Sequence, residues 1–474
     1  MAIARKIAYN AVISTIAKVI STILALVGIG MITRYLGVEG FGKYATILAF
    51  FGFFIAISDL GLYSVATREI SRKNADAKKI MGATFTLRVI VSAAVSMLSP
   101  LLLIFLPYEG DVKLGIFLVS ISFGFASSYG LLNGIFQKHL IMDRVALTEL
   151  CGKVIQVGVI YYAVQADRGL TMIIMALLLS MLFNFIVLFI LSRRYVPFAL
   201  HIDVPYWKKF LRLSLPMGVA TFVTFLYIKM DTIILSIVGT QEEVGIYNAA
   251  YKIVDTLAFF PAMIIGLMLP LLSLFIFSDR AKFSRIADKT MKVFILMVVP
   301  IIIATLFMAD FIMLVIGGGA FEDSVVVLRI LIFASALIFF GHFYNNVLLA
   351  GNQQKRLMVA LIIAAILNIT ANIIFIPHFS YMASAIISVG TELFVVAAGA
   401  ILSYRYLRYK PHISFLWRIL VAGGFMIIAF VLARDLHALA AGCIAMTVYL
   451  VGIIVFHAVS RKELMSIFLR RDDV

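Results

Sequence analysis

Apolar residues run through this chain in long blocks, and short polar segments separate one block from the next. A helix needs about 20 apolar residues to cross a bilayer, within a range of about 17–25. The segments that satisfy this requirement are 11–33, 43–66, 82–106, 114–135, 146–164, 170–191, 213–238, 245–277, 292–316, 326–350, 357–376, 381–403, 416–433 and 438–458. The pattern therefore predicts an all-α polytopic membrane protein with about 14 transmembrane helices.

The eighth segment, 245–277, is unusually long and contains Pro261 and Pro270. Proline removes a backbone donor and clashes with the preceding turn of a helix. We therefore expect this segment to be kinked.

Composition supports the membrane class. Hydrophobic residues make up 63% of the 474 residues and charged residues 14%, with a mean hydropathy of +1.08. Soluble domains have about 45–50% apolar and about 25% charged residues, so soluble enzymes and nucleic-acid-binding proteins are excluded. The net charge of +16 then indicates basic loops that face anionic lipid, and no nucleic-acid partner is expected.

Basic residues alternate between the connecting segments. Of the 40 Lys and Arg residues, most fall in every second connection when the N-terminus is placed in the cytoplasm. The opposite connections hold only Arg34, Lys43, Lys113, Arg168, Arg329 and Arg434. Cytoplasmic loops carry the excess of Lys and Arg in membrane proteins. We therefore expect a multi-pass protein of the cytoplasmic (inner) membrane with both termini in the cytoplasm.

Two segments six spans apart resemble each other. Ile32–Tyr44 and Leu235–Tyr247 both leave a span, turn on a glycine and reach Gly-x-Tyr at the start of the next span. A plainer explanation is that glycine-rich turns between helices look alike. If the similarity reflects a repeat, the offset of six spans, an even number, gives both copies the same orientation in the membrane. It then predicts two parallel lobes related by an axis along the membrane normal. The predicted domains are a six-helix lobe at 1–195, an interfacial linker at 196–212, a second six-helix lobe at 213–410, and two additional helices with a cytoplasmic tail at 411–474.

Four motifs carry a family resemblance. They are RYLGVEGFGKY at 34–44, DLGLYSVATREIS at 59–71, LPMGVATFVTFLYIKMDTIIL at 215–235 and EVGIYNAAYKIVDT at 243–256. With them the chain resembles the polysaccharide transporter family of oligosaccharide-lipid flippases, which includes the O-antigen type. That family shares a superfamily with the multidrug and toxin extrusion transporters and the lipid II flippases. The resemblance implies two six-helix lobes, a central cavity and alternating access, with glycans on a polyprenyl phosphate or pyrophosphate as substrates.

Ionisable residues inside the first six spans form a candidate binding layer. Lys18, Arg88 and Lys153 each lie six or seven residues inside a span, which places them about 9–11 Å deep. Asp59 and Glu149 lie near the same level. Phosphate binding requires fixed positive charge, so the three cations are candidate substrate-binding residues. Lysines at this depth also reach the headgroups by snorkelling, and Glu149 can pair with Lys153 along its own helix.

The later spans contain a second set of charges. Lys229 and Lys252 complete the candidate substrate-binding residues, whereas Asp231, Asp255 and Glu392, together with Asp59, are candidate ion-coupling residues. A carboxylate near mid-membrane that exchanges a proton is a common means of ion coupling. The alternative for Lys252 and Asp255, which share a helix face, is a salt bridge that only stabilises packing.

Motifs for other chemistry are missing. No histidine is spaced with carboxylates or thiols like a metal ligand, and no GxxxxGK[ST] loop is present, so no metal, cofactor or ATP hydrolysis is expected. We therefore expect a secondary transporter, not an enzyme, that flips lipid-linked oligosaccharide for cell-surface polysaccharide assembly. Its expected partners are the lipid-linked oligosaccharide, membrane lipids, H⁺ or Na⁺, and polysaccharide assembly proteins. The alternatives are an ion-coupled multidrug exporter of the same superfamily and a membrane glycosyltransferase or polymerase.

Overall fold

The computed structural model describes residues 2–72 and 74–458, and within these residues it contains helices and no strand. The helices are α1 (Ala2–Asp59), α2 (Leu62–Ile70), α3 (Ala77–Ile104), α4 (Gly110–Lys138), α5 (Met142–Gln165), α6 (Gly169–Tyr195), α7 (Val204–Val238), α8 (Gln241–Leu257), α9 (Phe259–Phe275), α10 (Arg280–Gly317), the short 3₁₀ helix η1 (Gly319–Phe321), α11 (Ser324–Ala350), α12 (Gln354–Leu407), α13 (Leu416–Leu432) and α14 (Ala438–Val455). In the described part of the chain, 11 helical segments are long and apolar enough to cross a membrane, with α8 and α9 taken as one. The prediction of an all-α polytopic membrane protein is confirmed.

Two helices each carry two of the predicted spans. α1 is interrupted at Gly37, whose φ of 66° lies in the left-handed region, and α12 is interrupted at Ser380 with a φ of 51°. α13, with 17 residues, carries the thirteenth predicted span. The expected break in the eighth span is also confirmed, because α8 and α9 are separated at Ala258, three residues before Pro261.

The second predicted span ends earlier than its apolar pattern suggested. α1 ends at Asp59, and α2 begins at Leu62 after two residues with positive φ, Leu60 at 46° and Gly61 at 67°. A Cβ on Gly61 would lie 2.3 Å from the carbonyl oxygen of Ser214 on α7. This close approach explains why the motif beginning at Asp59 requires a glycine.

The chain forms two compact units. The first comprises the described residues up to Asn248 together with Ile316–Ala320 and Ile369–Tyr381. The second comprises Ala249–Val315, Phe321–Asn368 and the described residues from Met382 onward. The division into two six-helix lobes stays a prediction, and the end of the predicted cytoplasmic tail, 459–474, lies outside the described residues.

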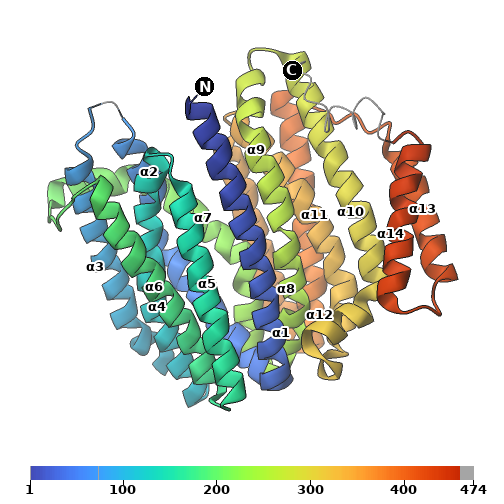
Figure 1. Cartoon of the computed structure of the whole chain (residues 1–474), viewed down its shortest axis with the longest axis horizontal. Coiled ribbons are helices and arrows are strands. Elements are labelled where there is room, and N and C mark those ends of the chain that lie inside the picture. The colour runs from blue at the N-terminus through green and yellow to red at the C-terminus, as the bar shows by residue number, and fades with distance from the viewer. Residues whose placement is uncertain (1, 73, 459–474) are drawn as a thin grey trace. The chain divides into compact units, whose positions relative to one another are not determined.

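The first unit is built on helix packing among α1 to α7. α3, α4, α5 and α6 stand side by side, as Figure 1 shows, and α1 packs along α5 and α4. Aromatic rings fill one part of the interior, where Phe85 of α3 contacts Phe189 of α6 and Phe198 beyond it. Phe85 and Phe198 are buried, and Phe189 is half-buried beside them.

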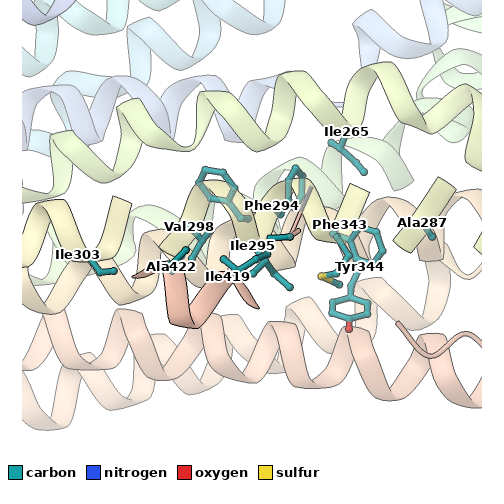
Figure 2. Close-up of a cluster of buried hydrophobic side chains, with 14 of the residues drawn as sticks. Ile265, Ala287, Phe294, Ile295, Val298, Ile303, Phe343, Tyr344, Ile419 and Ala422 are labelled. Carbon is teal, nitrogen blue, oxygen red and sulfur yellow. The ribbon is translucent and has the colours of Figure 1, made fainter. Parts of the chain in front are cut away.

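The second unit has a core of apolar side chains from α9, α10, α11 and α13 (Figure 2). Phe294 and Phe339 meet edge to face with ring centroids 5.6 Å apart. Gly423 brings α13 close to α10, since a Cβ there would lie 2.9 Å from Val299. Tyr449 of α14 donates a hydrogen bond to the Leu296 carbonyl at 2.9 Å, so both additional helices are fixed against α10.

The connection from α12 to α13 is also fixed to α10. One carboxylate oxygen of Asp288 accepts hydrogen bonds from the Tyr409 hydroxyl at 2.8 Å and from the His412 amide at 3.1 Å. Burial and the neighbouring Asp288 both raise the pKa of Tyr409, so this hydroxyl remains a donor at neutral pH.

The two copies of the Gly-x-Tyr repeat meet each other inside the first unit. A Cβ on Gly42 would lie 1.6 Å from the Gln241 carbonyl oxygen, and a Cβ on Gly245 would lie 2.1 Å from the Val38 carbonyl oxygen. The side chain of Thr46 also donates to that of Gln241 at 2.9 Å. The second half of α1 and the start of α8 therefore cross backbone against backbone, and the glycines make this crossing possible.

We expect Gly245→Ala to lower the midpoint of thermal unfolding of the purified protein in detergent. The added methyl group has no space, and overpacking of this kind costs about 1–3 kcal/mol. Gly158→Ala is the matched control, because no atom lies within 4 Å of a Cβ at Gly158. Alanine is the better helix former, so the control variant should be unchanged or more stable. Equal midpoints for Gly245→Ala and the parent protein would show that the crossing does not constrain the fold.

Candidate functional site

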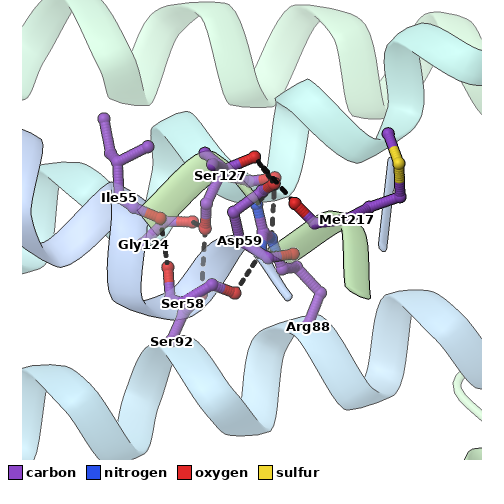
Figure 3. A network of polar contacts seen from close by, with 9 residues as sticks. Ile55, Ser58, Asp59, Arg88, Ser92, Gly124, Ser127 and Met217 are labelled. Carbon is purple, nitrogen blue, oxygen red and sulfur yellow. Dashed lines mark hydrogen bonds and ion pairs between the residues drawn. The ribbon is translucent and has the colours of Figure 1, made fainter. Parts of the chain in front are cut away.

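The guanidinium group of Arg88 lies at the end of α1. Its Nη1 donates to the Ser58 carbonyl at 2.5 Å and to the Asp59 carbonyl at 3.2 Å, and its Nε donates to the Ser127 carbonyl of α4 at 3.2 Å (Figure 3). Arg88 is only 3% exposed. The last carbonyls of a helix have no partner within it, so Arg88 satisfies groups that would otherwise be unpaired.

Asp59 extends this network to a fourth helix. One of its carboxylate oxygens lies 3.5 Å from Nη2 of Arg88, and the other accepts a hydrogen bond from Thr221 of α7 at 3.3 Å. The side chain of Asp59 is 24% exposed, whereas that of Arg88 is 4% exposed. Ser92 and Ser127 share a further hydrogen bond of 2.9 Å between their hydroxyl groups. The predicted proximity in depth of Arg88 and Asp59 is thus a direct contact in the structure.

A second polar group lies where α1 packs along α5. Lys18 is exposed on α1, and it lies close enough to Glu149 of α5 for the two charges to attract each other. One helical turn further along α5, the ammonium group of Lys153 donates to the side-chain oxygen of Gln156 at 2.8 Å. The residues Lys18, Glu149 and Lys153, called the α1–α5 charge group below, place two cations and one anion on neighbouring helices.

Asn184 of α6 lies beside this charge group. A Cβ on Gly152 would lie 2.3 Å from the side-chain oxygen of Asn184, so the glycine leaves the space that the amide fills. Asn184 also shares a hydrogen bond with the hydroxyl of Tyr129, which itself feels the charge of Glu149. The amide oxygen is buried without a hydrogen-bond partner.

Charged residues of α7 and α8 in the first unit are placed differently. Asp231 is 2% exposed, and one of its oxygens accepts a hydrogen bond from the Tyr247 hydroxyl, the tyrosine of the second Gly-x-Tyr copy. Lys229, two residues earlier, is half-buried. Asn248 accepts a hydrogen bond from Thr232 at 3.1 Å. Asp231 therefore joins α7 to α8 directly.

The second unit contains the remaining candidates. Lys252 and Asp255 are half-buried on α8, and Glu392 on α12 is 9% exposed. A carboxylate oxygen of Glu392 lies 3.7 Å from the position that a Cβ on Gly341 would occupy, so α11 leaves room for this side chain. Glu392 forms no hydrogen bond or ion pair with another described residue. No group of three or more His, Cys, Asp or Glu residues in the described ranges is suited to hold a metal ion.

Two residues of the 34–44 motif have roles that the sequence did not indicate. The Tyr35 hydroxyl donates to Asp167 at 2.6 Å and accepts from the Gly169 amide, which fixes the turn from α5 to α6. Lys43 pairs with Glu39, Glu109 and Asp111. Their place within a motif is the signal that could have drawn attention to Tyr35 and Lys43. Their partners could not be found from the sequence, because all of them except Glu39 are 66 or more residues away.

We expect Arg88→Ala to reduce the amount of folded protein in the membrane and its midpoint of thermal unfolding. Removing one partner of a buried ion pair costs about 3–5 kcal/mol, and here two carbonyls lose their donors as well. Thr221→Val is the matched control, since it removes one long hydrogen bond to Asp59 and leaves Arg88 in place. Fluorescence size-exclusion chromatography and thermal unfolding measure both effects. If Arg88→Ala were as stable and abundant as the parent, these hydrogen bonds would not be needed to stabilise the fold.

A family model described as "Polysaccharide biosynthesis protein" matches residues 7–276. No curated protein matches the chain in sequence. Among solved structures, the chain is similar to a lipid II flippase MurJ in an inward closed conformation, with 15% identity, a TM-score of 0.77, and coverage of 94% of this chain and 99% of that one.

Two transporters of the MOP superfamily also share the fold. One is a multidrug resistance MATE family transporter in an inward-facing conformation, with 14% identity, a TM-score of 0.68, and coverage of 82% of this chain and 94% of that one. The other is a MOP superfamily transporter from Pyrococcus furiosus whose binding pocket has reversed polarity, with 16% identity, a TM-score of 0.57, and coverage of 85% and 96%. At these identities the likeness establishes the fold.

Proposed function

Because the chain belongs to the polysaccharide biosynthesis protein family, we propose that it is a secondary transporter of lipid-linked oligosaccharide. It flips a glycan carried on a polyprenyl phosphate or pyrophosphate from the cytoplasmic to the outer leaflet by alternating access. The observation that carries this proposal is the α1–α5 charge group, in which Lys18, Lys153 and the carboxylate of Glu149 lie on two neighbouring membrane-spanning helices.

The charge balance of this group suits an anionic ligand. A charge inside the bilayer is costly, so ionisable groups there are usually paired or functional. Glu149 carries one negative charge against the two positive charges of Lys18 and Lys153, so the group as a whole is positively charged and attracts a phosphate. Lys18 is exposed, which leaves its ammonium group accessible, whereas the donors of Arg88 already bind protein carbonyls. We therefore assign the substrate phosphate to the two lysines and give Arg88 a structural role at the end of α1.

We expect the double variant Lys18→Gln and Lys153→Gln to slow flipping of polyprenyl-pyrophosphate-linked oligosaccharide by roughly tenfold or more. The reason is the loss of charge-assisted hydrogen bonds to the phosphate, each of which contributes about 1.5–3 kcal/mol. The measurement uses purified protein in proteoliposomes, and a membrane-impermeant enzyme detects the glycan on the outer face. Lys355→Gln is the matched control, because this lysine is exposed at the start of α12.

The same proteoliposomes separate the alternative functions. Transport of a cationic dye without any flipping of lipid-linked glycan would favour the multidrug exporter. Extension or transfer of the glycan would indicate a glycosyltransferase or polymerase. Unchanged flipping by the double lysine variant would remove the α1–α5 charge group from the substrate site.

We assign ion coupling to Glu392. Asp255 is the second candidate for this role. Glu392 is buried in the second unit beside Gly341 and Val395, and burial without a cation disfavours the charged form of a carboxyl group. A group of this kind takes up a proton when it is buried and releases it when water reaches it. H⁺ is therefore the coupling ion that Glu392 suits best.

We expect Glu392→Gln to abolish the stimulation of flipping by an imposed pH gradient while leaving slow flipping without a gradient. Glutamine has nearly the same shape as a protonated glutamate but exchanges no proton. The paired control is Lys252→Met with Asp255→Asn, which removes this cation and this carboxylate of α8 together. Gradient stimulation that survives in Glu392→Gln and is lost in the paired variant would move the coupling role to Asp255.

A further inference from the structure

The segment between α6 and α7 is tied closely to the start of α3. The His201 amide donates to the Thr86 hydroxyl at 2.9 Å, and the indole of Trp207 donates to the Ala83 carbonyl at 2.8 Å. A Cβ on Gly82 would lie 2.4 Å from the Ala199 carbonyl oxygen, so the two backbones touch. The hydrogen bonds of His201 and Trp207, together with this backbone contact, give the segment a fixed orientation.

Apolar side chains of this segment are divided between the core and the surface. Phe198 is buried at 3% exposure, whereas Leu200 and Ile202 are 67% and 68% exposed and Val204 is 48% exposed. The fixed backbone holds these three side chains away from the core that Phe198 enters. They form an exposed apolar edge, and contact between these side chains and water is unfavourable.

Cations surround this apolar edge. Lys208 and Lys209 are exposed at the start of α7, and Arg212 is exposed one turn later. Lys79 of α3 lies 3.5 Å from Asp203, which caps α7 by accepting a hydrogen bond from the Tyr206 amide. That hydrogen bond and Lys79 lower the pKa of Asp203. A second carboxylate, Glu69, acts on Tyr206 but pairs with Arg68 and Arg72, so the cations outnumber the carboxylates here. The surface is positively charged at neutral pH.

This combination fits one environment. The bilayer core disfavours lysines, and water disfavours the apolar edge, whereas the membrane interface offers acyl carbons directly beside charged headgroups. Anionic headgroups add attraction for each nearby Lys or Arg. The half-buried rings of Tyr206 and Trp207 suit the same layer.

We infer that residues 199–212, together with Lys79, form a binding surface for anionic phospholipid. Leu200, Ile202 and Val204 enter the acyl boundary, and the ammonium and guanidinium groups of Lys208, Lys209 and Arg212 contact the phosphates. This surface is separate from the α1–α5 charge group, and it holds the start of α7 at a fixed depth in the interface.

The two tryptophans of the chain make the surface directly observable. Trp417→Phe leaves Trp207 as the only indole, and Trp417 is 57% exposed, so the replacement is tolerated. This parent protein is placed in nanodiscs of phosphatidylcholine that contain a minor share of brominated phosphatidylglycerol or brominated phosphatidylcholine. Bromine quenches indole fluorescence only at short range. We expect brominated phosphatidylglycerol to quench Trp207 more strongly.

The charge variant is Lys208→Gln, Lys209→Gln and Arg212→Gln in the same parent. Each neutralised cation should lower the preference for phosphatidylglycerol by up to about fivefold. The matched control neutralises Lys282, Arg285 and Lys289, three exposed cations of α10, and should keep the preference. Leu200→Ser with Ile202→Ser should reduce quenching by both lipids, because the apolar edge then leaves the acyl boundary. Circular dichroism confirms that each variant is folded.

Four results would overturn the inference. Equal quenching by the two lipids in the parent would remove the headgroup preference, and a preference that survives in the charge variant would place it elsewhere. Absence of quenching by either lipid would show that the surface faces water or a protein partner. Displacement of the brominated lipid by equimolar polyprenyl phosphate would assign the surface to the transport substrate instead. Under the inference, unlabelled anionic phospholipid displaces the brominated lipid only when it is in excess.

Discussion

The guanidinium group of Arg88 supplies hydrogen bonds that no water can supply inside a bilayer. Backbone carbonyls at a helix end must find partners within the protein when the helix ends in hydrocarbon. Arg88 provides them for Ser58 and Asp59, reaches Ser127 of α4, and through Asp59 connects to α7. The end of α1 is thereby fixed against three other helices. The contact fixes the half of α1 that follows Gly37, whereas Lys18 lies on the half that precedes it.

Much of the fold follows from the one-dimensional pattern because the bilayer imposes one strong requirement on length and polarity. The predicted segments are helical, and Pro261 marks the break between α8 and α9 through its missing donor. The end of α1 was harder to place. Apolar residues continue past Asp59, and only the positive φ of Leu60 and Gly61, which close packing against α7 demands, shows where the helix stops.

The candidate site was only partly predictable, because residue counting gives depth along a helix but not the direction a side chain faces. Depth placed Arg88 near Asp59, and the two are in contact. Depth also placed Lys18 and Glu149 at one level, but it did not reveal that their helices pack together or that Asn184 fills the space left by Gly152. Similarly, the repeat identified Gly42 and Gly245 as equivalent, but their mutual contact is a tertiary fact that no local pattern encodes.

The two kinds of cation in the first unit differ in how much of their hydrogen-bonding capacity is already used. Arg88 presents a planar set of donors, and protein acceptors at the end of α1 and on α4 occupy both its Nε and its Nη1. A lysine has a single ammonium group with three donors on a flexible stem, and Lys18 is exposed. Arginine is suited to permanent neutralisation of fixed carbonyls, and lysine to a ligand that arrives and leaves. A transporter must release its substrate in every cycle, so the lysines are better suited than Arg88 to hold the phosphate.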